Sequence, residues 1–201
     1  MNMAVDEALL LTATRPVLRF YGWRRPSLSF GYFGRFSDVT TEEPRREIIR
    51  RWTGGGIVLH GADITYSIVL PREHSPELPS ARVVYSEVHE AIREALCGDF
   101  EVALASEDAA KVSEACFANP VTADVVLRGR KIAGAAQRRT RAGLLHQGSI
   151  QHEGLPQSFP TAFAGVLCER FEAKQLETDV VTRARMLTTE KYGTSAWLHR
   201  R

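Results

Sequence analysis

The chain is organised around residues 50–67, which read RRWTGGGIVLHGADITYS. The three consecutive glycines at 54–56 carry no Cβ, so this backbone can adopt positive φ and a ligand can lie directly against it. Two arginines precede the glycines, and two β-rich runs, 57–60 and 65–70, flank a turn at residues 61–63. The pattern predicts a cationic glycine loop that leads into a β-hairpin.

Three glycines in a row are also typical of a flexible turn between strands, and this alternative stays open at the level of sequence. The run is not followed by the Gly-Lys-Ser/Thr of a Walker phosphate-binding loop. It also lacks the G-x-G-x-x-G spacing of dinucleotide-binding proteins. Neither of these two nucleotide-binding classes is therefore indicated.

Composition favours one cytoplasmic domain over residues 1–201. The 201 residues are 44% hydrophobic, which is enough for one sizeable core. No apolar run is long enough to cross a membrane, and no signal peptide is evident. The cysteines, Cys97, Cys116 and Cys168, form neither a zinc pattern nor a disulfide framework, so they suit a reducing compartment and predict no metal site.

Hydrophobic periodicity and turn residues predict an alternation of helices and hairpins. Helices are expected at 2–12, 41–49, 84–96, 159–171 and 180–192. Strands are expected at 17–23, 27–32, 57–60, 65–70, 100–104, 123–127, 131–139 and 144–151, with 27–32 pairing with 17–23. This order predicts an α+β fold with a mixed, largely antiparallel sheet rather than a doubly wound one.

Further segments accompany the glycine loop in a fixed order. They are 2–10, 21–23 with 26–31, 129–138, 146–150 and 190–193 with Trp197. Together they resemble the lipoate–protein ligase and octanoyltransferase superfamily. The resemblance implies a biotin/lipoate protein ligase-type catalytic domain, similar in fold to biotin–lipoate ligases and class II aminoacyl-tRNA synthetases. The sequence departs from the family pattern at its two ends. No C-terminal accessory domain is expected, and at the N-terminus either the start is trimmed or the sheet lacks an edge strand.

Cys116 is the residue that points to one branch of this superfamily. A lone cysteine is usually a small buried hydrophobe, and we keep that interpretation for Cys97 and Cys168. Cys116 instead precedes Phe117 and stands 15 positions before Lys131 (131 − 116), which resembles the cysteine-dependent octanoyltransferases. A nearby ammonium favours the thiolate form of a cysteine, so Cys116 and Lys131 are the expected catalytic pair.

In the reaction that this resemblance implies, the thiolate takes an octanoyl (or lipoyl) group from acyl carrier protein. The acyl-cysteine then passes the group to a lysine of a lipoyl domain, either of a 2-oxoacid dehydrogenase E2 or of the glycine-cleavage carrier protein. Exchange between thioesters needs no ATP, so no cofactor is expected.

The expected substrate-binding residues come from the glycine loop and from the strands after Lys131. They are Arg51, Gly54, Gly55, Gly56, Ile57, Val58, His60, Gly134, Ala135, His146, Gly148 and Ser149. The loop N–H groups would stabilise an oxyanion, and the small residues at 134–136 would form the floor of an acyl slot. Close sheet-to-helix packing explains the small residues equally well, and both histidines have a structural alternative to a role as proton carriers.

Six cations and no acid lie between residues 128 and 141, at Arg128, Arg130, Lys131, Arg138, Arg139 and Arg141. Such a run is usually a solvated strand face, although it would also steer an acidic carrier protein or lipoyl domain. It lacks interleaved aromatic residues, and the net charge is only +2, so nucleic acid is not an expected partner.

Two other functions remain possible from the sequence. An ATP-dependent lipoate–protein ligase would use ATP and Mg²⁺, with Arg51, the glycine loop and Lys131 binding a lipoyl-adenylate. A non-catalytic scaffold that binds acyl groups or carrier proteins predicts that neither Cys116 nor Lys131 lines the pocket.

Overall fold

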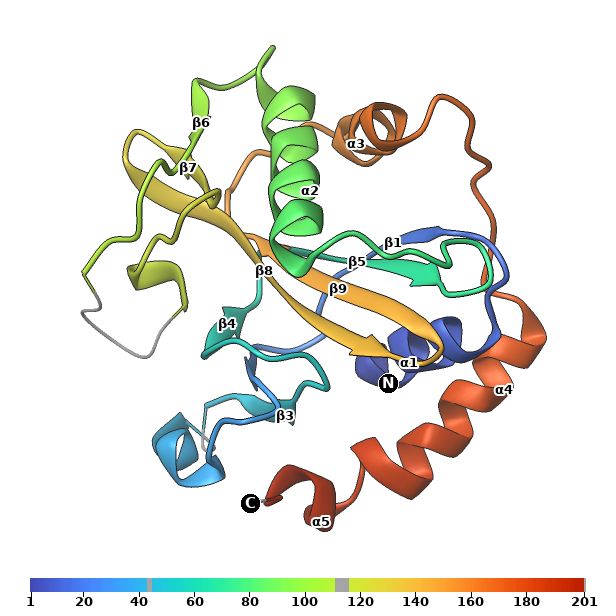
Figure 1. The fold of residues 1–201 in the computed structure, drawn as a ribbon. Coiled ribbons are helices and arrows are strands. Elements are labelled where there is room, and N and C mark those ends of the chain that lie inside the picture. The colour runs from blue at the N-terminus through green and yellow to red at the C-terminus, as the bar shows by residue number, and fades with distance from the viewer. Residues whose placement is uncertain (43–44, 111–115, 201) are drawn as a thin grey trace.

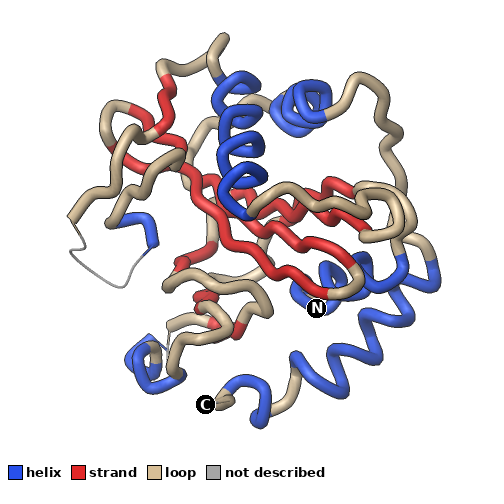
Figure 2. Tube along the Cα trace, viewed as in Figure 1, coloured by secondary structure: helices blue, strands red, loops and turns tan. Residues whose placement is uncertain are grey.

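The protein folds into two β-sheets with helices on both sides of the larger one (Figure 1, Figure 2). The structure, a computed structural model, describes residues 1–42, 45–110 and 116–200, without the side chain of Cys116. Within these ranges no helix is long and apolar enough to cross a membrane. The α+β class with a largely antiparallel sheet is confirmed.

The larger sheet has six strands, all paired antiparallel with their neighbours. In spatial order they are β1 (Val17–Tyr21), β5 (Ile64–Pro71), β9 (Gly143–Ile150), β8 (Arg130–Thr140), β7 (Val125–Leu127) and β6 (Val102–Leu104). The long β8–β9 hairpin forms its centre, and its register runs from Ala133 opposite Ile150 to Thr140 opposite Gly143. The predicted strands 123–127, 131–139 and 144–151 are therefore confirmed with small shifts of their ends.

The smaller sheet has three strands and lies beneath the centre of the larger sheet in Figure 1. Its middle strand is β2 (Ser27–Phe30), which pairs in parallel with β3 (Glu47–Arg50) and antiparallel with β4 (Val58–His60). The glycine run at 54–56 connects β3 to β4 and therefore lies at the end of this sheet that carries Arg50.

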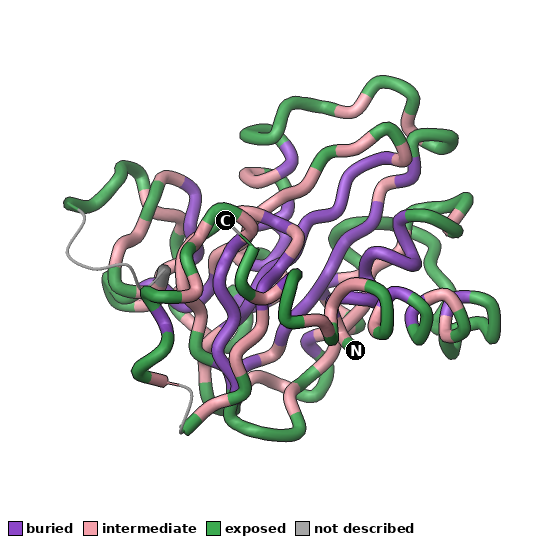
Figure 3. Tube along the Cα trace, turned by 90° about the horizontal axis from the view of Figure 1, so that it is seen from below, coloured by how far each residue is buried: buried purple, intermediate pink, exposed green. Residues whose placement is uncertain are grey.

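Four helices cover the two faces of the larger sheet. They are α2 (Ala81–Leu96) and α3 (Phe159–Leu167) on one face, and α1 (Asn2–Thr12) and α4 (Thr178–Leu187) on the other. Helix α2 is capped by Ser80, whose hydroxyl accepts a hydrogen bond from the Val83 amide, and it buries the predicted 84–96 stripe against the sheet. Figure 3 shows the buried positions running along the central strands.

Short elements complete the chain. They are the 3₁₀ turns η1 (Phe36–Asp38), η2 (Thr40–Glu42) and η3 (Cys116–Ala118), the π-helical turn η4 (Thr188–Tyr192) and the helix α5 (Ser195–Leu198). The expected helix at 180–192 therefore ends in a turn of different type, and α5 follows it. The expected helix at 159–171 ends four residues early, at Leu167.

Three local expectations are wrong. Strands β1 and β2 do not pair, because they belong to different sheets. For the same reason β4 and β5 form no hairpin, and the turn at 61–63 carries the chain from one sheet to the other. The expected helix at 41–49 is also absent at its C-terminal end, where the β-branched Ile48 and Ile49 join strand β3.

Two histidines lie in the core between α2 and the larger sheet. His89 Nδ1 donates a hydrogen bond to the Ala123 carbonyl oxygen, and His146 contacts Tyr66 and Gln137. The two rings meet edge to face, with centroids 6.2 Å apart. Burial lowers the pKa of His89 to about 4 and that of His146 to about 3, so both rings are neutral in the folded protein at pH 7.

Acid should therefore destabilise the fold well before its carboxylates titrate. Below pH 6.5 the unfolded chain binds protons at these histidines and the folded chain does not, so the free energy of unfolding falls as the pH falls towards 4. We expect a loss of about 1.4 kcal/mol per pH unit for each buried histidine. Urea unfolding between pH 6.5 and 5 measures this slope.

Two variants separate this effect from general titration. His89→Gln should flatten the slope, whereas His74→Ala, at an exposed histidine, should leave it unchanged. A slope that is equal in wild type and His89→Gln would contradict the assignment.

Candidate active site

A pocket lies between the smaller sheet and the α1-facing side of the larger sheet. It contains about 490 Å³ of empty space, part of it open to solvent. Apolar and small residues make up much of its wall. The lining residues are Met3, Tyr21, Trp23, Ser29, Arg51, Gly55, Val58, His60, Thr65, Phe117, Lys131, Gly134, Ala135, Ala136, Gln147, Gly148 and Ser149.

The glycine run wraps around the guanidinium of Arg51. Arg51 Nη2 donates to the carbonyl oxygens of Gly54, at 3.1 Å, and Gly56, at 2.8 Å. Gly55 has φ +86°, and a Cβ there would lie 3.2 Å from Arg51 Nη2. A Cβ at Gly31 would overlap with the carbonyl oxygen of Gly55. Glycine is needed at 31 for close approach and at 55 for its backbone conformation.

The two arginines before the glycines are internal rather than surface cations. Arg50 is 1% exposed and donates to the carbonyl oxygens of Tyr32, Gly34, Leu198 and Arg200. Arg51 is 7% exposed. Both guanidinium groups are therefore buried beside the loop, where they donate to backbone carbonyls, rather than exposed at the surface.

Lys131 enters the pocket from the start of β8 as one half of a buried ion pair. Its Nζ lies 2.7 Å from Oδ2 of Asp124, and neither side chain is more than 6% exposed. Asp124 also accepts hydrogen bonds from the hydroxyl of Tyr85, at 2.5 Å, and from the amide of Val121, at 2.6 Å. A paired ammonium keeps its charge when buried, so these contacts place a cation in the pocket wall.

Phe117 connects this cation to the cysteine segment. Lys131 Nζ lies 5.5 Å from the centroid of the Phe117 ring, within the range of a cation–π contact. Phe117 belongs to η3, which packs against β8 and begins at Cys116. The side chain of Cys116 itself lies outside the part of the chain that the structure describes.

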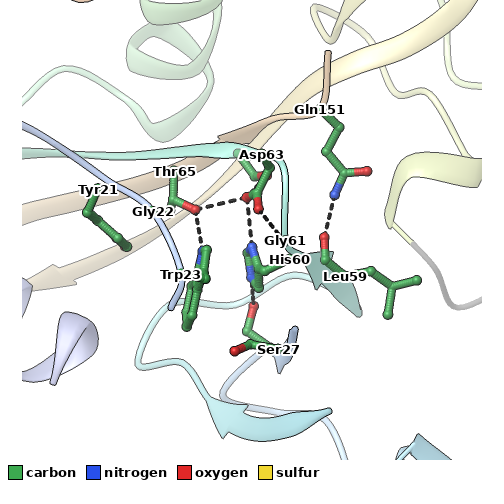
Figure 4. Close-up of polar contacts among 12 residues, drawn as sticks. Tyr21, Gly22, Trp23, Ser27, Leu59, His60, Gly61, Asp63, Thr65 and Gln151 are labelled. Carbon is green, nitrogen blue, oxygen red and sulfur yellow. Dashed lines mark hydrogen bonds and ion pairs between the residues drawn. The ribbon is translucent and has the colours of Figure 1, made fainter. Parts of the chain in front are cut away.

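The opposite wall carries a chain of buried polar side chains (Figure 4). His60 Nδ1 lies 2.8 Å from Oδ2 of Asp63, and His60 Nε2 lies 2.6 Å from the hydroxyl of Ser29. Arg51 Nη1 donates to the same hydroxyl at 2.7 Å. Trp23 stacks on the His60 ring, with centroids 4.1 Å apart. The arrangement fixes the imidazole from its edge and from one face.

Burial and hydrogen bonds determine the charges of His60 and Asp63 in this group of polar side chains. Burial lowers the pKa of His60, and this outweighs the opposing effect of Asp63. Burial alone would raise the pKa of Asp63, but hydrogen bonds from His60, Ser149 and the Gly61 amide hold it below its usual value. At neutral pH the pair is therefore a carboxylate and a neutral imidazole whose Nδ1 carries the proton.

Nine of the residues expected from the sequence line the pocket. They are Arg51, Gly55, Val58, His60, Lys131, Gly134, Ala135, Gly148 and Ser149. Gly54, Gly56, Ile57 and His146 do not. The carbonyl groups of Gly54 and Gly56 face Arg51 instead, and His146 faces α2 on the other side of the sheet, because side chains alternate along β9.

Sequence reasoning missed several polar residues that the fold brings to the site. Ser29 alternates with apolar residues on β2, and Asp124 directly precedes the apolar strand β7. Both positions are weak sequence signals of a buried polar group. Asp63 is a typical turn residue, so its sequence position favours a local role. Its contact to Ser149 on β9 depends on the fold.

Two other expectations change with the structure. Cys97 and Cys168 are exposed rather than buried. The cation run is not one solvated face, since Lys131 is buried and Arg138 stacks on the rings of Tyr32 and Trp52. The described residues hold no group of three or more His, Cys, Asp or Glu side chains arranged to bind a metal ion.

Comparison with known proteins gives consistent matches. The family described as the lipoyl protein ligase A/B catalytic domain matches residues 1–192. The octanoyltransferase LipM of Oceanobacillus iheyensis is 41% identical over 160 residues, which cover 74% of this chain and 58% of that protein. The chain thus spans less than two thirds of the length of this relative.

Solved structures support the fold. Lipoate-protein ligase A bound with ATP matches with a TM-score of 0.78 and 20% identity, covering 98% of this chain and 92% of that one. A bi-partite lipoate protein ligase from Thermoplasma acidophilum, solved in a study of the ligase and its E2 lipoyl domain, matches with a TM-score of 0.72 and 19% identity over 98% and 90%. The expected lipoate ligase fold is confirmed.

The pocket wall depends on the absence of a side chain at position 148. A Cβ at Gly148 would overlap with the ring of Tyr66, which is fully buried against His146 and Phe163. Gly148→Ala should therefore lower the free energy of unfolding by about 1–3 kcal/mol, as overpacked cores do. Gly22→Ala is the matched control, because nothing lies near its Cβ position. Equal denaturation midpoints for both variants would contradict the packing.

Proposed function

Because this chain belongs to the lipoyl protein ligase A/B catalytic domain family, we propose that it transfers octanoyl groups in protein lipoylation. The donor is octanoyl acyl carrier protein, and the acceptor is the lysine of a lipoyl domain. The observation that carries the proposal is the contact between Lys131 and Phe117, which brings the cysteine segment to a cation in the pocket wall. The similarity to a LipM octanoyltransferase supports the same reaction.

Cys116 is the proposed nucleophile. Its thiolate attacks the carbonyl carbon of the octanoyl thioester, and the carrier leaves as a thiolate, which takes a proton from water, as the acyl-cysteine forms. The amine of the acceptor lysine then attacks the acyl-cysteine, an amide forms, and Cys116 is released with one proton from the amine. The positive charge of Lys131 favours the thiolate and stabilises the tetrahedral oxyanion.

Small residues on β8 and β9 provide the proposed acyl slot. Gly134, Ala135 and Ala136 line the pocket on one strand, and Gly148 lines it on the next. Val58 faces them from the smaller sheet. An apolar eight-carbon chain gains free energy by leaving water for such a surface, at about 0.8 kcal/mol per buried CH₂.

The proposed transferase uses no ATP, since thioester and acyl-cysteine have similar energies. Its partners are acidic carrier domains, which the exposed Arg128, Arg130, Arg139 and Arg141 would attract. The structural neighbour from Thermoplasma acidophilum, solved in a study that includes its E2 lipoyl domain, supports a lipoyl domain as acceptor.

The covalent intermediate gives the first test. Wild-type protein incubated with octanoyl acyl carrier protein should gain the mass of one octanoyl group, and Cys116→Ala should gain none. Lys131→Met should slow this acylation by about 10²-fold or more, because the thiol loses its stabilising charge. Intact-mass spectrometry on quenched samples follows the reaction.

Cys97→Ala and Cys168→Ala are the matched controls, since both thiols are exposed and outside the pocket. They should acylate at the wild-type rate. Full transfer by Cys116→Ala that requires ATP would contradict the proposal and favour a ligase.

The position of Lys131 can be tested without removing it. A Cβ at Gly134 would lie 2.5 Å from Lys131 Cε and 2.7 Å from its Nζ, so Gly134→Ala must move the flexible end of the lysine. We expect acylation to slow by about tenfold while the thermal midpoint changes little. Gly165→Ala, with open space around its Cβ position, is the control. Unchanged acylation by Gly134→Ala would show that the position of Lys131 does not matter.

A further inference from the structure

The second half of the proposed reaction needs a group that accepts a proton. When an amine attacks an acyl-cysteine, its nitrogen becomes positively charged in the tetrahedral intermediate. That nitrogen must lose a proton before the thiolate leaves, or the amine itself is expelled again. A base close to the pocket prevents this return and typically accelerates such a step by 10²–10⁴-fold.

Lys131 is not suited to this task in the observed geometry. Its ammonium is 2.7 Å from the carboxylate of Asp124, and a protonated amine has no lone pair to offer. Arg51 is a permanent cation. Burial raises the pKa of Tyr21 well above its usual value, so its hydroxyl stays protonated. Among the described residues that line the pocket, His60 is the titratable group left with a free base at neutral pH.

The hydrogen bonds around His60 determine which nitrogen is basic. Asp63 accepts a hydrogen bond from Nδ1 at 2.8 Å, so the proton of the neutral ring resides there. Nε2 therefore carries the lone pair, and it accepts from the hydroxyl of Ser29 at 2.6 Å. The same hydroxyl accepts from Arg51 at 2.7 Å. Ser29 and His60 both line the pocket, so this hydrogen-bonded pair is at the pocket wall.

We propose that Ser29, His60 and Asp63 form a proton relay for the amine-accepting half-reaction. The relay rests on the proposed acyl transfer. The positively charged nitrogen of the tetrahedral intermediate gives a proton to Ser29 Oγ, and Ser29 passes its own proton to His60 Nε2. The C–S bond then breaks, the amide remains on the acceptor, and the proton returns through Ser29 to the thiolate of Cys116.

Surrounding contacts hold the relay rigidly, as its geometry requires. Asp63 accepts from Ser149 at 2.7 Å and from Thr65 at 2.9 Å in addition to His60. Trp23 stacks on the imidazole and donates its indole N–H to Thr65 at 2.8 Å (Figure 4). Among the described residues, the guanidinium groups of Arg51 and Arg46 also act on His60, and they add to the effect of burial in opposing its protonation.

The test compares two nucleophiles on preformed acyl-enzyme. Both nucleophiles lose a proton from nitrogen after attack. The nitrogen of hydroxylamine, a weakly basic amine that is neutral at pH 7, becomes far more acidic than that of lysine and loses its proton to water, so it depends far less on a base. In Ser29→Ala and Asp63→Asn, transfer to the lipoyl domain should fall by about 10²-fold or more. Octanoyl transfer to hydroxylamine should stay within about threefold of wild type, because hydroxylamine largely bypasses the relay.

Ser37→Ala is the matched control, since it removes an exposed hydroxyl outside the pocket. It should transfer to both nucleophiles at the wild-type rate. Equal slowing of both nucleophiles in Ser29→Ala would show a merely structural role and overturn the relay, and so would unchanged transfer to the lipoyl domain.

Acyl-enzyme formation by each variant, measured as intact mass, shows that the variant is folded. Should Asp63→Asn fail to fold, Ser29→Ala alone decides the question. If wild-type protein never forms the acyl-enzyme, the proposed function fails before the relay is reached, so the two failures are distinguishable.

Discussion

A single buried carboxylate, Asp6 on α1, holds the site together. It accepts hydrogen bonds from Arg19 and Tyr21 on β1, at 2.6 and 3.0 Å, from Ser67 on β5 at 2.8 Å and from Gln147 on β9 at 2.6 Å. Asp6 is 0% exposed, so the cost of burying its charge must be met by these partners. The contacts fix α1 on three neighbouring strands, and this placement brings Met3 to the pocket wall.

Gln147 extends this constraint to the glycine loop. Its amide nitrogen binds Asp6, and its carbonyl oxygen accepts from the hydroxyl of Thr53 at 2.8 Å. The loop is therefore tied to the larger sheet on one side and to Arg51 on the other. Two further buried carboxylates, Asp63 and Asp124, orient His60 and Lys131 on opposite walls of the same pocket. His60 and Lys131 are thus each positioned by an acid, whereas Arg51 is held by Ser29 and by backbone carbonyls.

The local sequence pattern was sufficient to predict an element where contacts between residues close in sequence determine its structure. Helix α1 and the β8–β9 hairpin follow from periodicity and short turns, and both were predictable. The role of the 61–63 turn was not predictable, because Asp63 accepts a hydrogen bond from Ser149, which is 86 residues away in the sequence. Likewise, β3 is extended because it pairs with β2, which outweighs the helix-start signal before it. The glycine loop was predicted from its own residues and the role of Lys131 from resemblance, whereas the acidic partner of Lys131, Asp124, was not predicted.

The clamp of Arg50 on Leu198 and Arg200 has a consequence for biosynthesis. It joins positions about 150 residues apart, and it holds the strand that leads into the glycine loop. During translation, Arg50 emerges from the ribosome long before Leu198 and Arg200, whose carbonyl oxygens accept its hydrogen bonds. The strand that leads into the loop therefore completes these contacts only after nearly all of the described chain has been made.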